Sequence, residues 1–349
     1  MSVQLDPVAL ARLRLVAQGL TEPAADAVAA VRRLLAVQAQ EAVAPLAAVA
    51  LRTAPRPDRA AVEAALADRR LVRTWSQRGT LHLLAPEDVP WLLALTAPRM
   101  AAASRGVRLR EGLTDAEVAR AAAVVAEQLP PEGLRRPELL ARLGEAGFEV
   151  SGNRGYHLLV ALAVAGVLVI GARDTQYRFH LAADRLPPAE DLDRDEALAR
   201  LARRYASGHG PVSEKDLAFW AGLTLTDARR ALAAAGLTAV PSDAGAVWVS
   251  PGLLDAPQPQ APVVSVLPAF DELVVGYADR SPLLGPHPLD RIAPDRNGRF
   301  LPTVLVDGRL VATWAPGPPP QLETLTPLPA SLLARIEAAV DDQAVWPGR

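Results

Sequence analysis

Two glutamines separated by one residue are the side chains of this 349-residue sequence that point most directly to chemistry. Gln38 and Gln40 lie in the stretch LLAVQAQEAVAP. Gln38 continues an apolar stripe at helical spacing that is formed by Val28, Val31, Leu34 and Leu35. A buried amide without partners costs roughly 1–3 kcal/mol. Gln38 is therefore expected to join two helices or to hold a ligand or a water molecule.

Gln40 constrains the geometry of this segment. Two residues along a regular helix rotate a side chain by about 200°, so the two amides converge only if the helix ends or kinks near Gln40. The chain restarts an alanine-rich helix around Pro45, which favours such a break. Spacing alone leaves both a contact between helices and a ligand site open.

Composition and charge exclude several classes of chemistry. The absence of cysteine rules out disulfides, cysteine-ligated zinc, iron–sulfur clusters and a thiol nucleophile. The five histidines have no metal-ligand spacing, so we expect neither a metal nor a cofactor. With 37 basic and 39 acidic residues the net charge is −2, and any DNA-binding surface has to be local.

Targeting signals are not evident in the sequence. The N-terminal segment has no basic stretch followed by an apolar run, so it does not read as a secretory signal. The longest apolar run, residues 158–171, is shorter than the ~18 residues of a membrane span, and we interpret it as a buried helix leading into a strand. We expect a cytoplasmic monomer that associates with the nucleoid when it binds DNA.

An internal repeat organises the chain. Residues 161–167 and 231–237 match at all seven positions with conservative changes, and a strand, a turn and a second strand follow each copy. Capping patterns predict helix starts upstream, at Thr114, Asp193 and Ser213. Helices followed by a hairpin form a winged helix. Helices near 8–17, 26–37 and 58–67, with strands at 71–75 and 80–84, predict a further copy at the start of the chain.

The predicted fold class is α+β. Three tandem winged-helix modules are expected at residues 1–112, 113–190 and 191–255, and a small, barrel-like β-rich module at 256–349. The last module begins with a proline-rich linker at 255–262, contains a loop at 281–298 and ends in a helix at 331–340.

Four segments resemble a known family in the same order along the chain. They are LLAVQAQEAVAPLAAVALR, RTWSQRGTLHLLAPEDVPWLLAL, LPAFDELVVGYADRS and FLPTVLVDGRLVATW. Together, over about Val8 to Trp314, they resemble the winged-helix DNA glycosylases of the AlkZ/YcaQ type. In that family a glutamine, any residue, then glutamine or aspartate marks the catalytic site. Gln38 and Gln40 fit the double-glutamine version and depart from the aspartate subgroup, which favours the AlkZ-like branch.

The resemblance implies a reaction that suits two amides. Glutamine is neither an acid nor a base in the physiological range, so it cannot protonate an undamaged base. An N7- or N3-alkylated purine already carries positive charge and leaves without protonation. The amides then only orient water and solvate the sugar cation. The expected partner is double-stranded DNA with alkylated purines, bulky adducts and interstrand cross-links included.

Further candidates surround this pair in the sequence. Arginine clusters near the predicted hairpins and helices mark possible phosphate contacts, and we select Arg73, Arg78 and Arg154 together with His82 as DNA-binding residues. A hydrogen-bonded structural role for His82 stays open. Asp271 is the alternative carboxylate if the glutamines are structural, although its position favours a strand-end or turn aspartate.

The single lysine bears on strand cleavage. Glycosylases that also cut the strand form a Schiff base through an amine, and Lys215 falls in the exposed first turn of a predicted helix. The sequence therefore predicts a monofunctional enzyme. The alternative is a non-catalytic winged-helix protein that binds DNA or regulates it, since most winged helices only bind.

Overall fold

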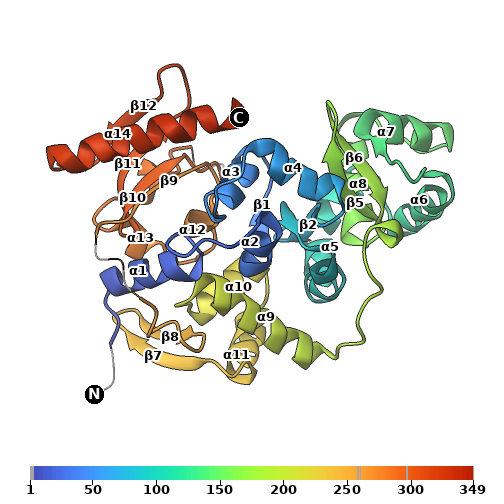
Figure 1. Ribbon diagram of the computed structural model, residues 1–349. Coiled ribbons are helices and arrows are strands. Elements are labelled where there is room, and N and C mark those ends of the chain that lie inside the picture. Colours follow the sequence, from blue (N-terminus) through green and yellow to red (C-terminus); the bar gives the residue numbers. More distant parts are fainter. Residues whose placement is uncertain (1–3, 258, 260, 296–297, 349) are drawn as a thin grey trace.

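The computed structural model describes residues 4–348, apart from 258, 260, 296 and 297. Helices and small sheets alternate along the chain, as the predicted α+β class requires (Figure 1). Two residues of the predicted linker, 258 and 260, and two of the predicted loop at 281–298 lie outside the described part. No helix within the described residues is both long and apolar enough to cross a lipid bilayer.

The first helix-and-hairpin unit surrounds the two glutamines. Its elements are α2 (Ala27–Leu34), β1 (Val37–Gln38), α3 (Ala44–Ala50), α4 (Arg59–Ala67), β2 (Val72–Gln77) and β3 (Thr80–Leu84). Asp26 and Asp58 begin α2 and α4, because each carboxylate accepts an otherwise unpaired N–H of the first turn. Helix α1 (Pro7–Ala17), which Asp6 caps, packs instead on the hairpin of the third unit.

The predicted helix over 26–37 is wrong at its C-terminal end. Helix α2 stops at Leu34, Leu35 takes a left-handed backbone with φ of +65°, and Val37 and Gln38 form a strand. The four apolar residues 34–37 are all buried. A short, fully apolar run fits a buried helix and a buried strand equally well, so its pattern could not distinguish them.

The second and third units repeat this order. The second contains α6 (Asp115–Gln128), β4 (Leu134–Arg135), α7 (Arg136–Glu145), α8 (Gly152–Val164), β5 (Leu168–Arg173) and β6 (Tyr177–Leu181). The third contains α9 (Arg194–His209), α10 (Glu214–Ala221), α11 (Leu225–Ala234), β7 (Thr238–Ser242) and β8 (Gly245–Val249). The caps at Thr114, Asp193 and Ser213 are confirmed. The long α5 (Val89–Arg110) joins the first two units.

The hairpins of the first two units share one sheet. Its strand order is β1-β3-β2-β5-β6-β4, and the units meet where Arg73 of β2 pairs with Ile170 of β5. Each unit contributes its three strands in mirrored order about this junction. Strand β1 consequently occupies one edge of a six-stranded sheet rather than a separate small one.

The C-terminal part has an open sheet. It is built from β9 (Val264–Leu267), β10 (Thr303–Val306), β11 (Arg309–Ala315) and β12 (Gln321–Thr324), in the order β12-β11-β10-β9, and the described strands do not close into a barrel. Helix α14 (Ala330–Val345) covers it, and two short helices, α12 (Glu272–Val275) and α13 (Ser281–Leu284), follow β9 (Figure 1). Trp346, just after α14, returns to the core of the first unit.

Candidate active site

Strand β1 holds Gln38 at the rim of the six-stranded sheet. Gln38 lies directly opposite His82 in the antiparallel register with β3, and the Ala39 N–H donates to the Leu81 carbonyl oxygen at 2.7 Å. These contacts use the inner edge of the strand. The outer edge of β1 faces α12 of the C-terminal part, where the Gln38 N–H finds its acceptor.

The two amides converge because this segment is extended. Side chains two residues apart point to the same side of a strand, and Gln38 Nε2 donates to Gln40 Oε1 at 2.8 Å. Gln38 is 7% exposed, whereas Gln40 is exposed to solvent. Gln38 is the last residue of β1 and Gln40 lies in a bend two residues further on, so the pair meets at the end of a strand and not at a helix kink, with Gln40 at the protein surface.

Arg78 fixes the orientation of the Gln38 amide. Its Nη2 donates to Gln38 Oε1 at 3.3 Å and its Nη1 donates to the Trp220 carbonyl oxygen at 2.7 Å. A guanidinium has donors only, so the Gln38 atom that faces it is oxygen and the NH₂ group faces Gln40. Burial lowers the pKa of Arg78. The structure places this predicted DNA-binding residue within the glutamine site.

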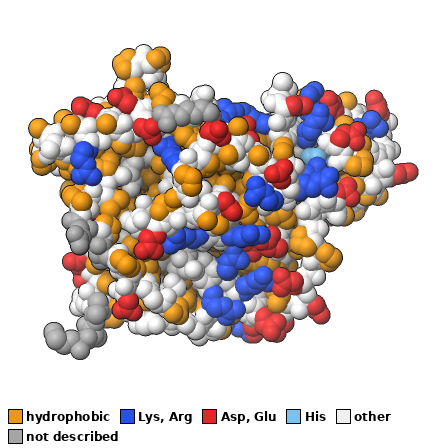
Figure 2. Space-filling view, in the orientation of Figure 1, with side chains coloured by type: hydrophobic (Ala, Val, Ile, Leu, Met, Phe, Trp, Pro, Cys, Tyr) orange, Lys and Arg blue, Asp and Glu red, His pale blue; other side chains and the backbone are white. Residues whose placement is uncertain are grey.

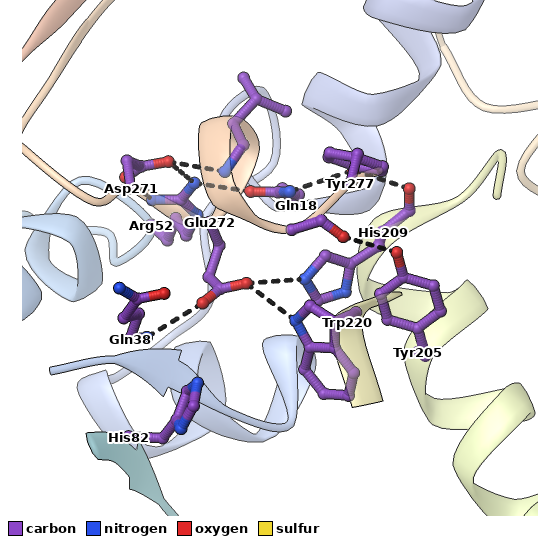
Figure 3. Close-up of polar contacts among 12 residues, drawn as sticks. Gln18, Gln38, Arg52, His82, Tyr205, His209, Trp220, Asp271, Glu272 and Tyr277 are labelled. Atoms are coloured by element: carbon purple, nitrogen blue, oxygen red, sulfur yellow. Dashed lines mark hydrogen bonds and ion pairs between the residues drawn. The ribbon is translucent and has the colours of Figure 1, made fainter. Parts of the chain in front are cut away.

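Glu272 contacts the backbone of Gln38, although no pattern in the sequence singled it out. Its Oε1 accepts the Gln38 N–H at 2.9 Å, and its Oε2 accepts from Trp220 Nε1 at 3.1 Å and from His209 Nε2 at 3.3 Å (Figure 3). Burial would raise the pKa of this carboxyl, but the hydrogen bond from His209 and the electrostatic influence of His209 and then of Arg78 lower the pKa to about 2. The group is therefore a carboxylate.

Asp271, the alternative carboxylate, has a structural environment. Both of its oxygens accept from Arg52, at 2.7 and 2.8 Å, and it also caps α12 by accepting the Leu273 N–H at 2.9 Å. Its turn-aspartate interpretation fits these contacts. The segment PAFDEL thus carries two acids, of which Glu272 and not Asp271 contacts the backbone of Gln38.

His82 is fully buried on β3. Its Nδ1 lies 3.2 Å from Ser76 Oγ and 3.1 Å from the Thr80 carbonyl oxygen. Burial, assisted by the charge of Arg78, lowers the pKa of His82 to about 3, so the ring is neutral in the folded protein. In this conformation it is a hydrogen-bonded residue behind Gln38 and has no exposed surface with which to meet DNA.

Arg73 and Arg154 are engaged within the protein. Arg73 is 5% exposed, stacks over the Tyr177 ring at 4.3 Å and donates to the Ala39 carbonyl oxygen between the two glutamines. Arg154 pairs with Glu117 at 2.5 Å, at the far side of the second unit. The structure therefore brings Gln38, Gln40, Arg78 and His82 together with the backbone contact of Arg73, and leaves Arg154 apart.

Two sizeable hollows lie away from the glutamines. Two adjoining cavities of about 530 and 670 Å³ lie along α5. Apolar side chains of α5 and α8 line both of them. Neither is lined by the glutamines. A smaller cavity of about 250 Å³ includes Arg73, Trp75 and Tyr177 in its walls.

Arginines gather on one face of the molecule. Figure 2 shows blue side chains across its middle and lower part, over the region of α9 to α11 in Figure 1. Arginines of α2, α9 and α11 pair with acids, namely Arg32 with Glu87, Arg194 with Asp227, Arg200 with Glu190, Arg229 with Glu214 and Arg230 with Asp195. The surface is mixed in charge, in agreement with the net charge of −2.

Three helix-and-hairpin units, with a converging pair of amides at one sheet edge, define the class as a multiple winged-helix protein. The model of the AlkZ-like DNA glycosylase family matches residues 31–345. The chain belongs to this family, which confirms the resemblance drawn from the sequence.

Two comparisons with individual proteins agree with this assignment. An interstrand DNA cross-link repair glycosylase from Streptomyces sahachiroi is 30% identical over 311 residues, which cover 84% of this chain and 82% of that protein. The solved structure of the Streptomyces sahachiroi DNA glycosylase AlkZ superposes with a TM-score of 0.80 at 26% identity, over 98% of this chain and 97% of the other.

Proposed function

We propose that this protein is a monofunctional DNA glycosylase that hydrolyses the N-glycosidic bond of cationic alkylated purines, in single adducts and in interstrand cross-links. The observation that carries the proposal is the hydrogen-bonded pair of Gln38 and Gln40, 2.8 Å apart at the edge of a sheet. Membership of the AlkZ-like family and the name of the Streptomyces relative support it.

The free lone pairs of the amides suit the reaction. Each amide oxygen has two lone pairs, of which Arg78 uses one on Gln38 and Gln38 uses one on Gln40. The remaining lone pairs accept O–H bonds from a water molecule and face the positive charge that develops on the sugar. Because the hydrogen bonds hold both amides in place, they need no reorganisation as this charge forms.

The bonds and charges balance without an acid. The C1′–N9 bond of an N7- or N3-alkylated purine breaks with its electron pair going to the base, which leaves as a neutral molecule. The sugar cation takes up the oriented water to form the abasic site, and one proton passes to solvent.

Cleavage of the strand requires an amine, and the position of Lys215 argues against one here. Lys215 is exposed in the first turn of α10, which Ser213 caps. None of its contacts ties it to Gln38 or Gln40. We therefore infer that the product is an intact strand with an abasic site.

Analysis of products from a duplex with one 7-methylguanine tests this proposal. The purified protein should release free 7-methylguanine and leave an abasic strand that breaks only on alkaline treatment. Borohydride should trap no covalent complex. A matched duplex with unmodified guanine should release nothing, and a cross-linked duplex tests whether the site accepts a tethered purine. Salt-dependent binding of DNA without release of any base would instead indicate the non-catalytic alternative.

A further inference from the structure

The buried acids of this protein differ in their partners. Asp271 pairs with Arg52 at 2.7 Å, Asp216 with Arg14 at 3.3 Å and Asp88 with Arg204 at 2.8 Å. Glu272 is equally buried, yet among the described residues no arginine or lysine nitrogen lies within 4.0 Å of its carboxylate. A buried charge without a counterion is costly, and this one contacts the backbone of Gln38.

His209 contacts the Glu272 carboxylate through one ring nitrogen. Its Nε2 donates to Glu272 Oε2, so that nitrogen carries a proton. Its Nδ1 is buried and has no hydrogen-bond partner in the described structure, while the ring stacks on Tyr205 at 4.6 Å. The carboxylate is thus held by three N–H donors, those of His209, Trp220 and the Gln38 backbone.

Arg78 is a further source of positive charge near the glutamines. Its two hydrogen bonds go to Gln38 Oε1 and to the Trp220 carbonyl oxygen rather than to Glu272. A guanidinium beside the glutamines opposes the formation of a cation there. The Glu272 carboxylate, which accepts the Gln38 N–H (Figure 3), offsets that effect.

We propose that Glu272 is a positioning residue that holds β1 through the Gln38 N–H and supplies the fixed negative charge that stabilises the sugar cation. This inference rests on the proposed function. Glu272 is buried and contacts the backbone of Gln38. Its carboxylate therefore acts on the sugar through its electric field and by holding β1, and not by direct contact with the substrate. At a separation of several ångströms in a partly buried site, such a charge changes the rate roughly 10- to 100-fold.

Binding of a cationic sugar analogue tests the charge separately from turnover. Two duplexes are compared, one with a protonated pyrrolidine in place of a deoxyribose and one with neutral tetrahydrofuran. The wild type should bind the pyrrolidine duplex at least about tenfold more tightly. Glu272→Gln, which keeps the shape, should lose most of this preference, and Glu41→Gln, which removes an exposed charge beside the site, should retain it.

Kinetics complete the test. Glu272→Gln should lower the single-turnover rate of 7-methylguanine release about 10- to 100-fold with affinity for the tetrahydrofuran duplex within threefold. Glu272→Asp keeps the charge, but its shorter side chain no longer reaches the Gln38 N–H, so this variant should keep the pyrrolidine preference and lose rate.

Two results would overturn this role for Glu272. One is a wild type that binds both duplexes equally, which needs no variant and so does not depend on whether Glu272→Gln folds. The other is a folded Glu272→Gln with unchanged rate and preference. A wild type that releases no base but prefers pyrrolidine through Glu272 would instead refute the enzyme function alone.

Discussion

At the scale of residues, the site depends on groups that hold one another in fixed orientations. Arg78 donates to the Gln38 amide oxygen and so orients that amide, and the Gln38 NH₂ group orients the Gln40 amide in the same way. Glu272 accepts the backbone N–H of Gln38 and holds the strand in place. Each contact is modest alone, but together they hold two amide oxygens in fixed orientations, which is what the proposed function requires of them.

The sequence predicted part of this arrangement. A family pattern two residues apart identified Gln38 and Gln40, and Arg78 and His82 were selected from the adjoining hairpin. Glu272 and His209 carried no local signal, because their contacts join residues 234 and 63 positions apart. The spacing of the histidines likewise gave no sign that His82, His180 and His209 are buried.

Burial of His82 makes the stability of the protein sensitive to acid. The pKa is about 3 in the folded protein and 6.5 in the unfolded chain, so the unfolded state binds the proton first. The His82 contribution is fully present above pH 6.5 and is lost as the pH falls from 6.5 towards 3. Between pH 7.5 and 5.0 it should account for about 2 kcal/mol of lost stability.

Urea unfolding at both pH values measures this contribution. His82→Gln is expected to be less stable than the wild type at pH 7.5, but its free energy of unfolding should fall by about 2 kcal/mol less on going to pH 5.0. An identical fall in the two proteins would mean that His82 titrates normally when folded. His180, whose pKa is about 4, remains in both proteins and cancels in the comparison.

At the scale of elements, the position of β1 follows from how α2 ends. The capping residues at Asp6, Thr114, Asp193 and Ser213 could be predicted because they act within one turn. The end of α2 could not, because packing against a neighbouring helix decides it. Gly208 of α9 lies so close to α2 that an added Cβ would be 2.1 Å from the Arg33 carbonyl oxygen.

Replacing this glycine should therefore disturb the site from a distance. Gly208→Ala pushes α9 away from the last turn of α2 and should lower the free energy of unfolding by about 1–3 kcal/mol. It should also slow base release, because β1 begins three residues after α2. Ser207→Ala, an exposed neighbour in α9, is the matched control. Equal stability of the two variants in urea would show that the helices can separate freely.

At the scale of the whole molecule, distant segments close around the first unit. The hairpins of two units share one sheet, Trp346 donates to the Pro57 carbonyl oxygen at 2.9 Å, and Arg52 of the first unit pairs with Asp271 next to Glu272. Repeats and caps predicted the order of the units along the chain. They gave no information on this closure, which relies on contacts between sequence-distant residues.

The Arg52–Asp271 pair is the strongest of these links. Both side chains are at most 1% exposed, and the contact is bidentate. Arg52→Leu leaves a buried carboxylate without its partner and should lower the free energy of unfolding by about 3–5 kcal/mol. Arg12→Leu, which breaks an exposed pair with Asp307, should cost less than about 1 kcal/mol. Similar losses for both variants, measured by urea unfolding, would contradict a central role for the buried link.

The single-turnover rate of 7-methylguanine release from duplex DNA, compared between the wild type, Gln38→Ala and Gln40→Ala, tests the central claim most directly. Gln128→Ala, which truncates an exposed glutamine on α6, serves as the matched control. We predict release by the wild type and by the control, and rates at least about 100-fold lower in both site variants with DNA binding retained. Wild-type rates in either site variant would contradict the assignment of catalysis to the glutamine pair.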